Sequence, residues 1–414
     1  MAQREFDVVV WGASGFTGEL VAAYLAQSYG VDGPLRWAIA GRNRDKLEQV
    51  RDNLLPAPQQ ARLPILIADG NDPASLAALV TRTAVVCTTV GPYAKYGTAL
   101  VAACAEAGTG YCDLAGEVQW MARTIPAYQS QTQASGARIV HTCGFDSTPF
   151  DLGVWFLQQS MLERHGVAAA QVKARVASIR GGASGGTIAS SLNLMEEADQ
   201  DPAIRRLIAN PYALYPKGTP PGRDGADQQG ARFDRDFEHW TYPFIMAIVN
   251  TRVVRRSNAL LGFPWGEDFR YDEAVLAPSR LQATSRAIAT GIGMACLALR
   301  PLRKLAQRFL PAPGEGPSAA EREAGSYELY FHGIHPTDRC KDLRVRVTGD
   351  MDPGYGSTAK MLGEAAVCLA LDEPSVDGGF WTPASAMGGQ LLSRLVDKAG
   401  LTFELVDAEP PAKG

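Results

Sequence analysis

The sequence predicts an α/β fold: a Rossmann domain with a doubly wound parallel sheet, followed by a second α+β domain built on a mixed or antiparallel sheet. Three observations predict it. Short apolar runs alternate with amphipathic stretches over the first 150 residues, a glycine-rich turn follows the first run, and the pattern changes afterwards. The chain has 414 residues, 46% of them hydrophobic, which is enough for two or three domains.

The first domain, residues 1–150, is expected to contain six strands joined by helices. The predicted strands are Phe6–Trp11, Leu35–Ala40, Pro64–Ala68, Ala84–Val90, Gly110–Leu114 and Arg138–Thr142. The predicted helices are Phe16–Ser28, Arg44–Leu54, Pro73–Thr81, Tyr96–Ala107 and Val118–Ser135. Crossovers of this length are typical of βαβ units in a parallel sheet.

The second domain, residues 151–374, has a different pattern. Strands are predicted at Gln171–Ile179, Ser326–His335 and Leu343–Thr348, with helices at Thr187–Ala198 and Thr358–Leu371. Residues 210–239 are polar and rich in Gly and Pro, so we expect a long loop that is functional or mobile. Pro311–Ser318 is predicted to be a linker. A helix at Ala384–Ala399 and a strand at Leu401–Val406 complete the chain.

Composition excludes several classes of protein. The net charge is −4, from 40 basic and 44 acidic residues, so no basic excess favours a nucleic-acid partner. Seven cysteines without a C-x-x-C pair indicate a reducing, cytoplasmic location. The chain has no apolar run of the ~18 residues that a spanning helix needs and no signal-peptide core. No metal site is expected, because His332 and His335 are three apart on a predicted strand and point to opposite faces.

One apolar segment, Ala287–Leu299, has two interpretations. A helix buried between domains or in a homodimer interface is the first, because short apolar runs usually lie in a core. The second is a peripheral membrane contact through residues 286–304, whose basic residues would meet anionic headgroups.

The glycine-rich turn predicts a site for a dinucleotide. Gly12, Gly15 and Gly18 lie between the first strand and the first helix. Glycine permits a tight turn, backbone approach to a pyrophosphate, and close packing of the helix. Helix N-termini also attract anions. The predicted contacts in this turn are Gly12, Ser14, Gly15, Phe16, Thr17 and Gly18.

The end of the second strand decides which dinucleotide is expected. The strand ends with Gly41-Arg42, with no Asp or Glu to bind a ribose hydroxyl, and an arginine fits a 2′-phosphate. We therefore expect NADP(H), with Arg42 as the main contact; the alternative is an ordinary exposed arginine. The remaining predicted cofactor contacts are Gly41, Asp69, Thr89, Gly91 and Pro92.

Several short motifs occur in order and carry a resemblance. They are Gly12–Gly18, Ala40-Gly41-Arg42, Gly91-Pro92-Tyr93-x-x-Tyr96-Gly97, Tyr111-x-Asp113-x-x-Gly116-Glu117, Cys143-Gly144-Phe145-Asp146-Ser147, Ser184-Gly185-Gly186-Thr187 and Trp381-Thr382-Pro383-Ala384. Together they resemble the saccharopine dehydrogenase-like oxidoreductases, and among these the trans-acting enoyl reductases. The resemblance implies an active cleft between two domains, a polyketide or fatty-acid synthase as partner, and a last helix and strand (within 375–414) that pack back on the first domain.

Candidate catalytic residues follow from this cleft. Tyr93 and Tyr96 would lie beside the nicotinamide and could donate to an enolate oxygen, or simply pack. Asp146 could serve as an acid in the reaction. Alternatively, Asp146 or Asp113 could hold a loop by accepting hydrogen bonds from backbone N–H groups. Residues 184–187 (Ser184, Gly185, Gly186 and Thr187) could bind a substrate carboxylate or carrier phosphate at a helix start, or only pack.

Three functions stay open at this stage. The first is NADPH-dependent reduction of the C=C bond of an enoyl thioester or another lipid-like intermediate. The second is a C–N oxidoreductase for an amino acid and a keto acid, with carboxylates held by arginines such as Arg175, Arg180, Arg252, Arg255 and Arg256. The third is a non-catalytic NADP-binding protein at a membrane or a synthase.

Overall fold

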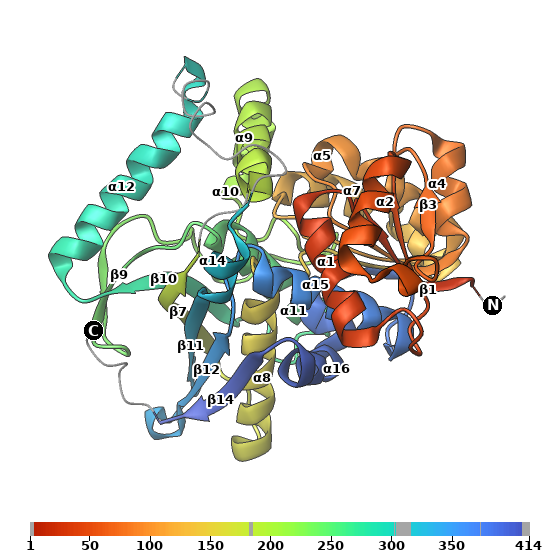
Figure 1. Ribbon diagram of the computed structural model, residues 1–414. Helices are drawn as coiled ribbons and strands as arrows, with labels where there is room; N and C mark the ends of the chain where they lie inside the picture. The colour runs from red at the N-terminus through yellow and green to blue at the C-terminus, as the bar shows by residue number, and fades with distance from the viewer. Residues whose placement is uncertain (1–3, 182–184, 302, 304–315, 373, 408–414) are drawn as a thin grey trace.

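The computed structural model describes residues 4–181, 185–301, 303, 316–372 and 374–407, apart from the side chains of residues 185–188. Its described strands form two separate seven-stranded sheets with helices between and around them (Figure 1). The predicted α/β architecture, a parallel sheet followed by a mixed one, is confirmed.

The first sheet is parallel throughout. Its strand order is β13-β6-β5-β4-β1-β2-β3. The strands are β1 (Phe6–Trp11), β2 (Trp37–Gly41), β3 (Ile65–Ile67), β4 (Thr83–Thr88), β5 (Gly110–Cys112), β6 (Arg138–Val140) and β13 (Gly379–Trp381). Its helices are α1 (Phe16–Tyr29), α2 (Arg44–Leu54), α3 (Ala57–Gln60), α4 (Pro73–Val80), α5 (Tyr93–Tyr96), α6 (Thr98–Ala107) and α7 (Val118–Ser135). β1 is buried along its whole length, which explains its apolar run Val8–Trp11, and the buried Asp7 at its start pairs with Arg36.

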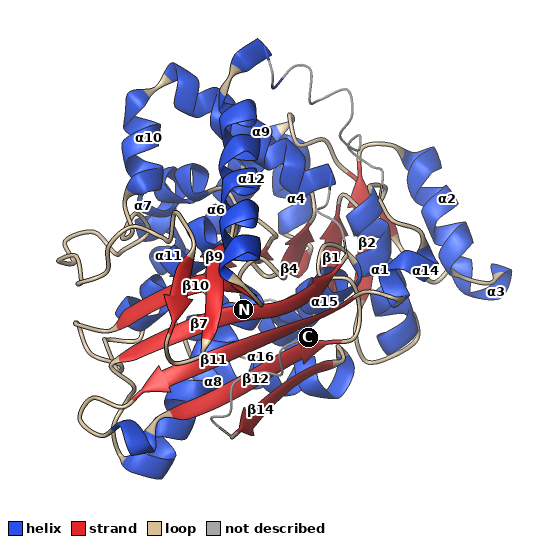
Figure 2. Cartoon of the chain, turned by 90° about the vertical axis from the view of Figure 1, so that its left-hand side faces the viewer, coloured by secondary structure: helices blue, strands red, loops and turns tan. Residues whose placement is uncertain are grey.

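The second sheet is mixed, with order β14-β12-β11-β7-β10-β9-β8 (Figure 2). Only the β7–β10 pair is parallel among the pairs of this sheet in the described chain. The strands are β7 (Gln171–Arg180), β8 (Arg232–Asp234), β9 (His239–Pro243), β10 (Arg270–Ala277), β11 (Ser326–Ile334), β12 (Leu343–Gly349) and β14 (Leu401–Val406). The other helices are α8 (Thr148–His165), α9 (Gly185–Gln200), α10 (Pro202–Ala209), α11 (Ala247–Leu260), α12 (Arg280–Ala298), α14 (Ala319–Glu323), α15 (Gly356–Leu371) and α16 (Pro383–Lys398).

Three helices connect the two sheets. α15 packs against α1 and the strands β1, β4 and β5, while α8 packs against β11 and β12. α16 lies between them, in contact with both α15 and α8 (Figure 1). One large cluster of buried residues therefore runs from the first sheet to the second, including Val10, Leu362, Leu391 and Phe331. This shared core fixes the position of one sheet relative to the other.

Three expectations need correction. The last strand, β14, pairs with β12 of the second sheet, so the implied return of that strand to the first domain is wrong; the C-terminal strand that joins the first sheet is β13. Residues 210–239 are not structureless, because they contain β8. The helix expected at Tyr96–Ala107 is split into α5 and α6. The elements from α10 to β10, and β13, have no counterpart among the predicted helices and strands.

The apolar segment Ala287–Leu299 lies almost entirely in α12, and it is not buried within this chain. Ala283 is the only buried residue of α12, which the structure describes completely. No helix in the described part of the chain is long and apolar enough to cross a membrane. The expectation that this segment packs in the core of a single chain is therefore wrong.

Candidate active site

A cavity of about 2180 Å³ lies between the carboxyl ends of the first sheet's strands and the helices α9 and α12. The carboxyl edge of a parallel sheet is where such folds bind ligands. The cavity is lined by all the predicted cofactor residues except Gly18, and by the three candidate catalytic residues Tyr93, Tyr96 and Asp146. The first-sheet members are Gly12, Ser14, Gly15, Phe16, Thr17, Gly41, Arg42, Asp69, Thr89, Gly91 and Pro92.

The glycine turn has the geometry that an anion site requires. Gly12 has φ of 86°, and a Cβ there would lie 2.4 Å from Val90 Cγ2. A Cβ on Gly18 would lie 2.2 Å from the Gly12 carbonyl oxygen, so Gly18 lets α1 pack against the turn instead of lining the cavity. No side chain caps the N-terminus of α1 at Gly15. Its first N–H groups are therefore available to a pyrophosphate.

Two cations lie where the adenosine end of a dinucleotide would be. Arg42 follows β2, is exposed, and forms no ion pair with the described residues. Lys46, in the first turn of α2, lines the same part of the cavity, whereas Arg44 points to Glu48 at 3.7 Å. Asp69 is occupied with its own turn, since its carboxylate accepts the Asn71 N–H at 2.9 Å. The pair Arg42 and Lys46 suits a 2′-phosphate.

The two candidate tyrosines differ in availability. The Tyr93 hydroxyl donates to the Thr88 carbonyl at 3.3 Å and accepts the Leu114 N–H at 3.1 Å, and its ring stacks on Trp120. Burial raises the pKa of Tyr93 well above its usual value. Tyr96, by contrast, is 54% exposed and lines the cavity. A phenol that is already engaged at both hydrogen-bonding positions is a poor donor to a substrate, so Tyr96 is the better candidate.

Asp146 is the carboxyl group that faces the cavity without a partner. Its side chain makes no hydrogen bond or ion pair with the residues that the structure describes. Burial raises the pKa of Asp146 to about 6. The neighbouring Ser147 hydroxyl lies 3.2 Å from Asn250 Oδ1, and Asn250 donates to Glu273 at 3.1 Å. This chain of hydrogen bonds holds the loop that presents Asp146.

The other candidate carboxylates serve the fold. Asp113 accepts hydrogen bonds from Tyr111 and from the N–H groups of Ala115 and Thr142, and lies 2.7 Å from His141. Asp151 accepts from Ser257 and from the Ala384 N–H. Cys143 is buried, which raises the pKa of its thiol. The hydrogen bonds of Asp113 support its loop-holding interpretation, and those of Asp151 tie α8 to α11 and to the start of α16.

The half of the cavity formed by the second sheet, α11 and α12 is mainly apolar, although Arg180, Gln282 and Arg286 also line it. Its walls come from β7, β9, β10, α11 and α12, with lining residues Val176, Ile179, Phe244, Ile248, Val275, Leu276, Met294 and Leu297. Leu194 and Ser190 of α9 complete the wall. Of the predicted residues 184–187, Ser184 lies outside the described residues, while Gly185, Gly186 and Thr187 form the first turn of α9. An apolar surface of this size suits a hydrocarbon chain.

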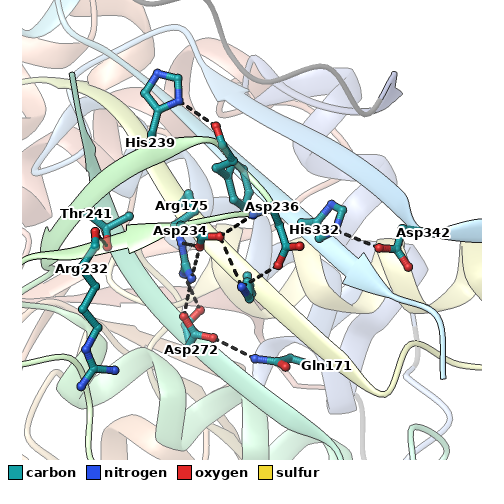
Figure 3. A network of polar contacts seen from close by, with 12 residues as sticks. Gln171, Arg175, Arg232, Asp234, Asp236, His239, Thr241, Asp272, His332 and Asp342 are labelled. Carbon is teal, nitrogen blue, oxygen red and sulfur yellow. Dashed lines mark hydrogen bonds and ion pairs between the residues drawn. The ribbon is translucent and has the colours of Figure 1, made fainter. Parts of the chain in front are cut away.

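Most of the arginines considered for carboxylate binding are engaged elsewhere. Arg175 pairs with Asp234 at 2.7 Å and with Asp272 at 2.6 Å, in a polar network on the second sheet (Figure 3). Arg252 and Arg255 bind Asp227 and Asp224 of the 210–239 stretch. Arg256 donates to the carbonyl groups of Leu214 and Phe380. Of the five arginines, Arg180 alone is among the described residues that line the cavity.

A second turn contributes to the nucleotide end of the cavity. Pro353, Gly354 and Tyr355 line it, and the Tyr355 ring lies 4.7 Å from the ring of Phe16 in an edge-to-face contact. The local sequence Asp-Pro-Gly-Tyr-Gly predicts a turn. Nothing local indicates that it meets the glycine turn, which lies more than 300 residues earlier.

Comparison with known proteins agrees with this geometry. Residues 8–140 match the family model of the saccharopine dehydrogenase NADP binding domain. A trans-acting enoyl reductase of Mycobacterium ulcerans is 39% identical, over 95% of this chain and 96% of its own. A trans-acting enoyl reductase of Mycobacterium tuberculosis has the same identity and coverage. The chain belongs to the trans-acting enoyl reductase family. Another Mycobacterium tuberculosis relative is 43% identical over 97% of both chains.

The fold has a counterpart among solved structures. Apo saccharopine dehydrogenase (L-Glu forming) from Saccharomyces cerevisiae superposes with a TM-score of 0.52, covering 97% of this chain and 99% of its own. At 13% identity, this likeness concerns the fold alone. The predicted membership of the saccharopine dehydrogenase-like oxidoreductases is confirmed, and so is the prediction of an NADP(H) cofactor.

Proposed function

We propose that this protein reduces the C=C bond of an enoyl thioester whose acyl chain is lipid-like or polyketide-derived. The observation that carries the proposal is the mainly apolar substrate half of a cavity whose other half has the features of an NADP site. The transfer of an acyl chain from water to such a surface lowers the free energy of the system. The relatives named trans-acting enoyl reductases support the same chemistry.

The residues of the first sheet would hold the cofactor. The N–H groups at the start of α1 bind the pyrophosphate, and Arg42 with Lys46 binds the 2′-phosphate. The turn Thr89–Pro92, which lines the cavity, would lie beside the nicotinamide. Bound NADPH supplies the hydride for the β-carbon of the substrate.

Two side chains complete the reduction in this proposal. Tyr96 donates a hydrogen bond to the thioester oxygen, which becomes an enolate oxygen as the β-carbon receives the hydride. Asp146 in its acid form then gives a proton to the α-carbon. Its raised pKa keeps the acid form available near neutral pH. The hydride and the proton together saturate the double bond.

The alternatives have less support. A C–N oxidoreductase for an amino acid and a keto acid needs several cations for carboxylates, and most of the arginines that suggested it are buried in ion pairs or bound to carbonyl groups. A non-catalytic NADP-binding protein does not need a large apolar cavity beside the nucleotide.

The partners belong to the same proposal. A substrate carried by a polyketide or fatty-acid synthase agrees with the word trans-acting in the relatives' names. Two partner contacts are predicted for the apolar segment Ala287–Leu299, most of which lies in α12. They are a homodimer interface and a peripheral membrane contact through residues 286–304.

The test is a titration with NADPH and NADH by fluorescence, followed by oxidation of NADPH with a medium-chain trans-2-enoyl thioester. We expect tight NADPH binding and enoyl-dependent oxidation. Turnover with 2-oxoglutarate and lysine, but not with the thioester, would support the C–N alternative. NADPH binding without any turnover, even with a carrier-bound enoyl substrate, would support the non-catalytic alternative.

A further inference from the structure

Helix α12 carries an apolar stripe that nothing in the described chain covers. Leu281, Ile288, Ile292 and Leu299, just after its end, are 79%, 57%, 59% and 55% exposed. With 3.6 residues per turn, these four side chains lie within roughly 40° of one another around the axis. Figure 1 shows α12 projecting away from the second sheet. Exposed apolar side chains aligned on one helix usually mark a binding surface.

The opposite face of the same helix closes the cavity. Thr290, Gly293, Met294 and Leu297 line it. α12 is therefore a single layer between the apolar substrate half and the exterior of the molecule. Its outward stripe and its inward lining are two apolar surfaces separated by one helix.

The charge around the stripe is mainly positive, although Arg303 is buried and pairs with Asp199 of α9 at 2.8 Å and Arg300 lies 3.6 Å from the same carboxylate. Residues 280–304 contain Arg280, Arg286, Arg300, Arg303 and Lys304 and no Asp or Glu. Arg280 and Arg300 lie roughly 100° to either side of the stripe around the axis, and the Arg300 side chain is 66% exposed. Basic residues that flank an apolar stripe are typical of helices that lie in the plane of an anionic membrane surface.

We propose that α12 binds the surface of an anionic lipid bilayer through Leu281, Ile288, Ile292 and Leu299. The helix lies along the headgroup region with the stripe inserted and with Arg280 and Arg300, which flank it, at the phosphates. Resting on the proposed function, this contact places the substrate cavity one helix away from the lipid phase. A lipid-like acyl chain then needs little exposure to water before it enters.

A second copy of the chain fits this surface less well. A two-fold contact between two α12 helices would bring the same cationic segment against itself, because residues 280–304 contain no acidic residue and the neighbouring Asp199 is already paired with Arg303. Anionic lipid supplies the opposite charge along the whole helix.

The experiment is vesicle flotation of the full-length protein with phosphatidylcholine vesicles that contain or lack phosphatidylglycerol. We expect binding to the anionic vesicles that weakens at high salt. The double variant Ile288→Glu/Ile292→Glu should bind about tenfold more weakly or worse, because it removes two inserted side chains. Val396→Glu is the matched control, since Val396 is an exposed apolar residue of α16 (43%).

Each outcome has a definite meaning. Absence of wild-type binding to anionic vesicles, or equal binding by the double variant, would overturn the proposal. A wild-type dimer that the double variant converts to a monomer, without any vesicle binding, would assign the stripe to a second copy. NADPH binding is measured on the same samples, and we expect it to be unchanged because neither isoleucine lines the cavity. The membrane contact and the proposed reductase activity can thus fail separately.

Discussion

The Ser190 hydroxyl donates a 2.7 Å hydrogen bond to the carboxylate of Glu117. The same carboxylate accepts the N–H groups of Tyr93 at 2.7 Å and Ala94 at 2.9 Å. Glu117 therefore joins α9, which follows a strand of the second sheet, to the start of α5, which lines the cavity. Its side chain is buried, and burial raises its pKa.

Replacement of Glu117 tests how much this junction contributes. Glu117→Ala leaves the buried Tyr93 N–H and the half-buried Ala94 N–H without an acceptor, so we expect the free energy of unfolding to fall by about 2–4 kcal/mol. Ser190→Ala is the matched control, because it keeps both N–H contacts and should cost about 1 kcal/mol. Urea unfolding curves measure both values. Equal losses would contradict the assignment of the larger share to the backbone contacts.

The proposed acid can be recognised by its pH dependence. Asp146 must be protonated to act, and its pKa is about 6, so kcat/KM for enoyl reduction should fall as the pH rises through that region. Asp146→Asn should lower kcat about 10²- to 10⁴-fold and abolish this limb of the profile. Steady-state rates from pH 5 to 9 at saturating NADPH are the measurement.

A control separates this effect from loss of the cofactor. NADPH affinity of Asp146→Asn should match the wild type, because the proposed role of Asp146 concerns the substrate alone. An unchanged pH profile in the variant would assign the proton to another group.

Cofactor preference should depend on Arg42. Arg42→Asp removes a cation and adds an anion near the proposed 2′-phosphate, so NADPH affinity should fall about 100-fold or more while NADH affinity changes little. Fluorescence titration gives both constants. Arg44→Asp is the control, since Arg44 lies two residues away but does not line the cavity. Similar losses for both nucleotides in Arg42→Asp would refute the role.

Substitutions at two glycines of the turn should affect different properties, stability at Gly18 and NADPH affinity at Gly15. Gly18→Ala places a methyl group 2.2 Å from the Gly12 carbonyl oxygen, so we expect a loss of several kcal/mol in stability. A Cβ on Gly15 is 3.4 Å from that oxygen, so Gly15→Ala should fold normally and lose NADPH affinity through its contact with the pyrophosphate. Thermal unfolding and nucleotide titration distinguish the two. A stable Gly18→Ala protein would contradict the packing argument.

Local patterns predicted the features that depend on neighbouring residues. The glycine spacing at residues 12–18 sets one turn, and apolar runs such as Phe6–Trp11 set buried parallel strands, so both could be read along the chain. Pairings across long distances could not. Arg255 forms an ion pair with Asp224, and the Tyr93 hydroxyl accepts a hydrogen bond from the Leu114 N–H. These partners become neighbours only in the fold.

The fate of Ala287–Leu299 shows a second limit. An apolar run indicates that water is excluded from one side of a helix, but it does not identify what excludes it. In α12 one face forms part of the cavity wall, and nothing in the described chain covers the other face. The same composition agrees with a core, an interface or a membrane surface.

Residues 379–406 supply an edge strand to each sheet, β13 beside β6 and β14 beside β12. Of the strands described here, these two are synthesised last. During synthesis on the ribosome, β6 and β12 therefore wait with unpaired backbone groups, which can join a neighbouring nascent chain. Completion of both sheets is a late event in biogenesis, and the period before it is when this protein is most exposed to aggregation and most dependent on chaperones.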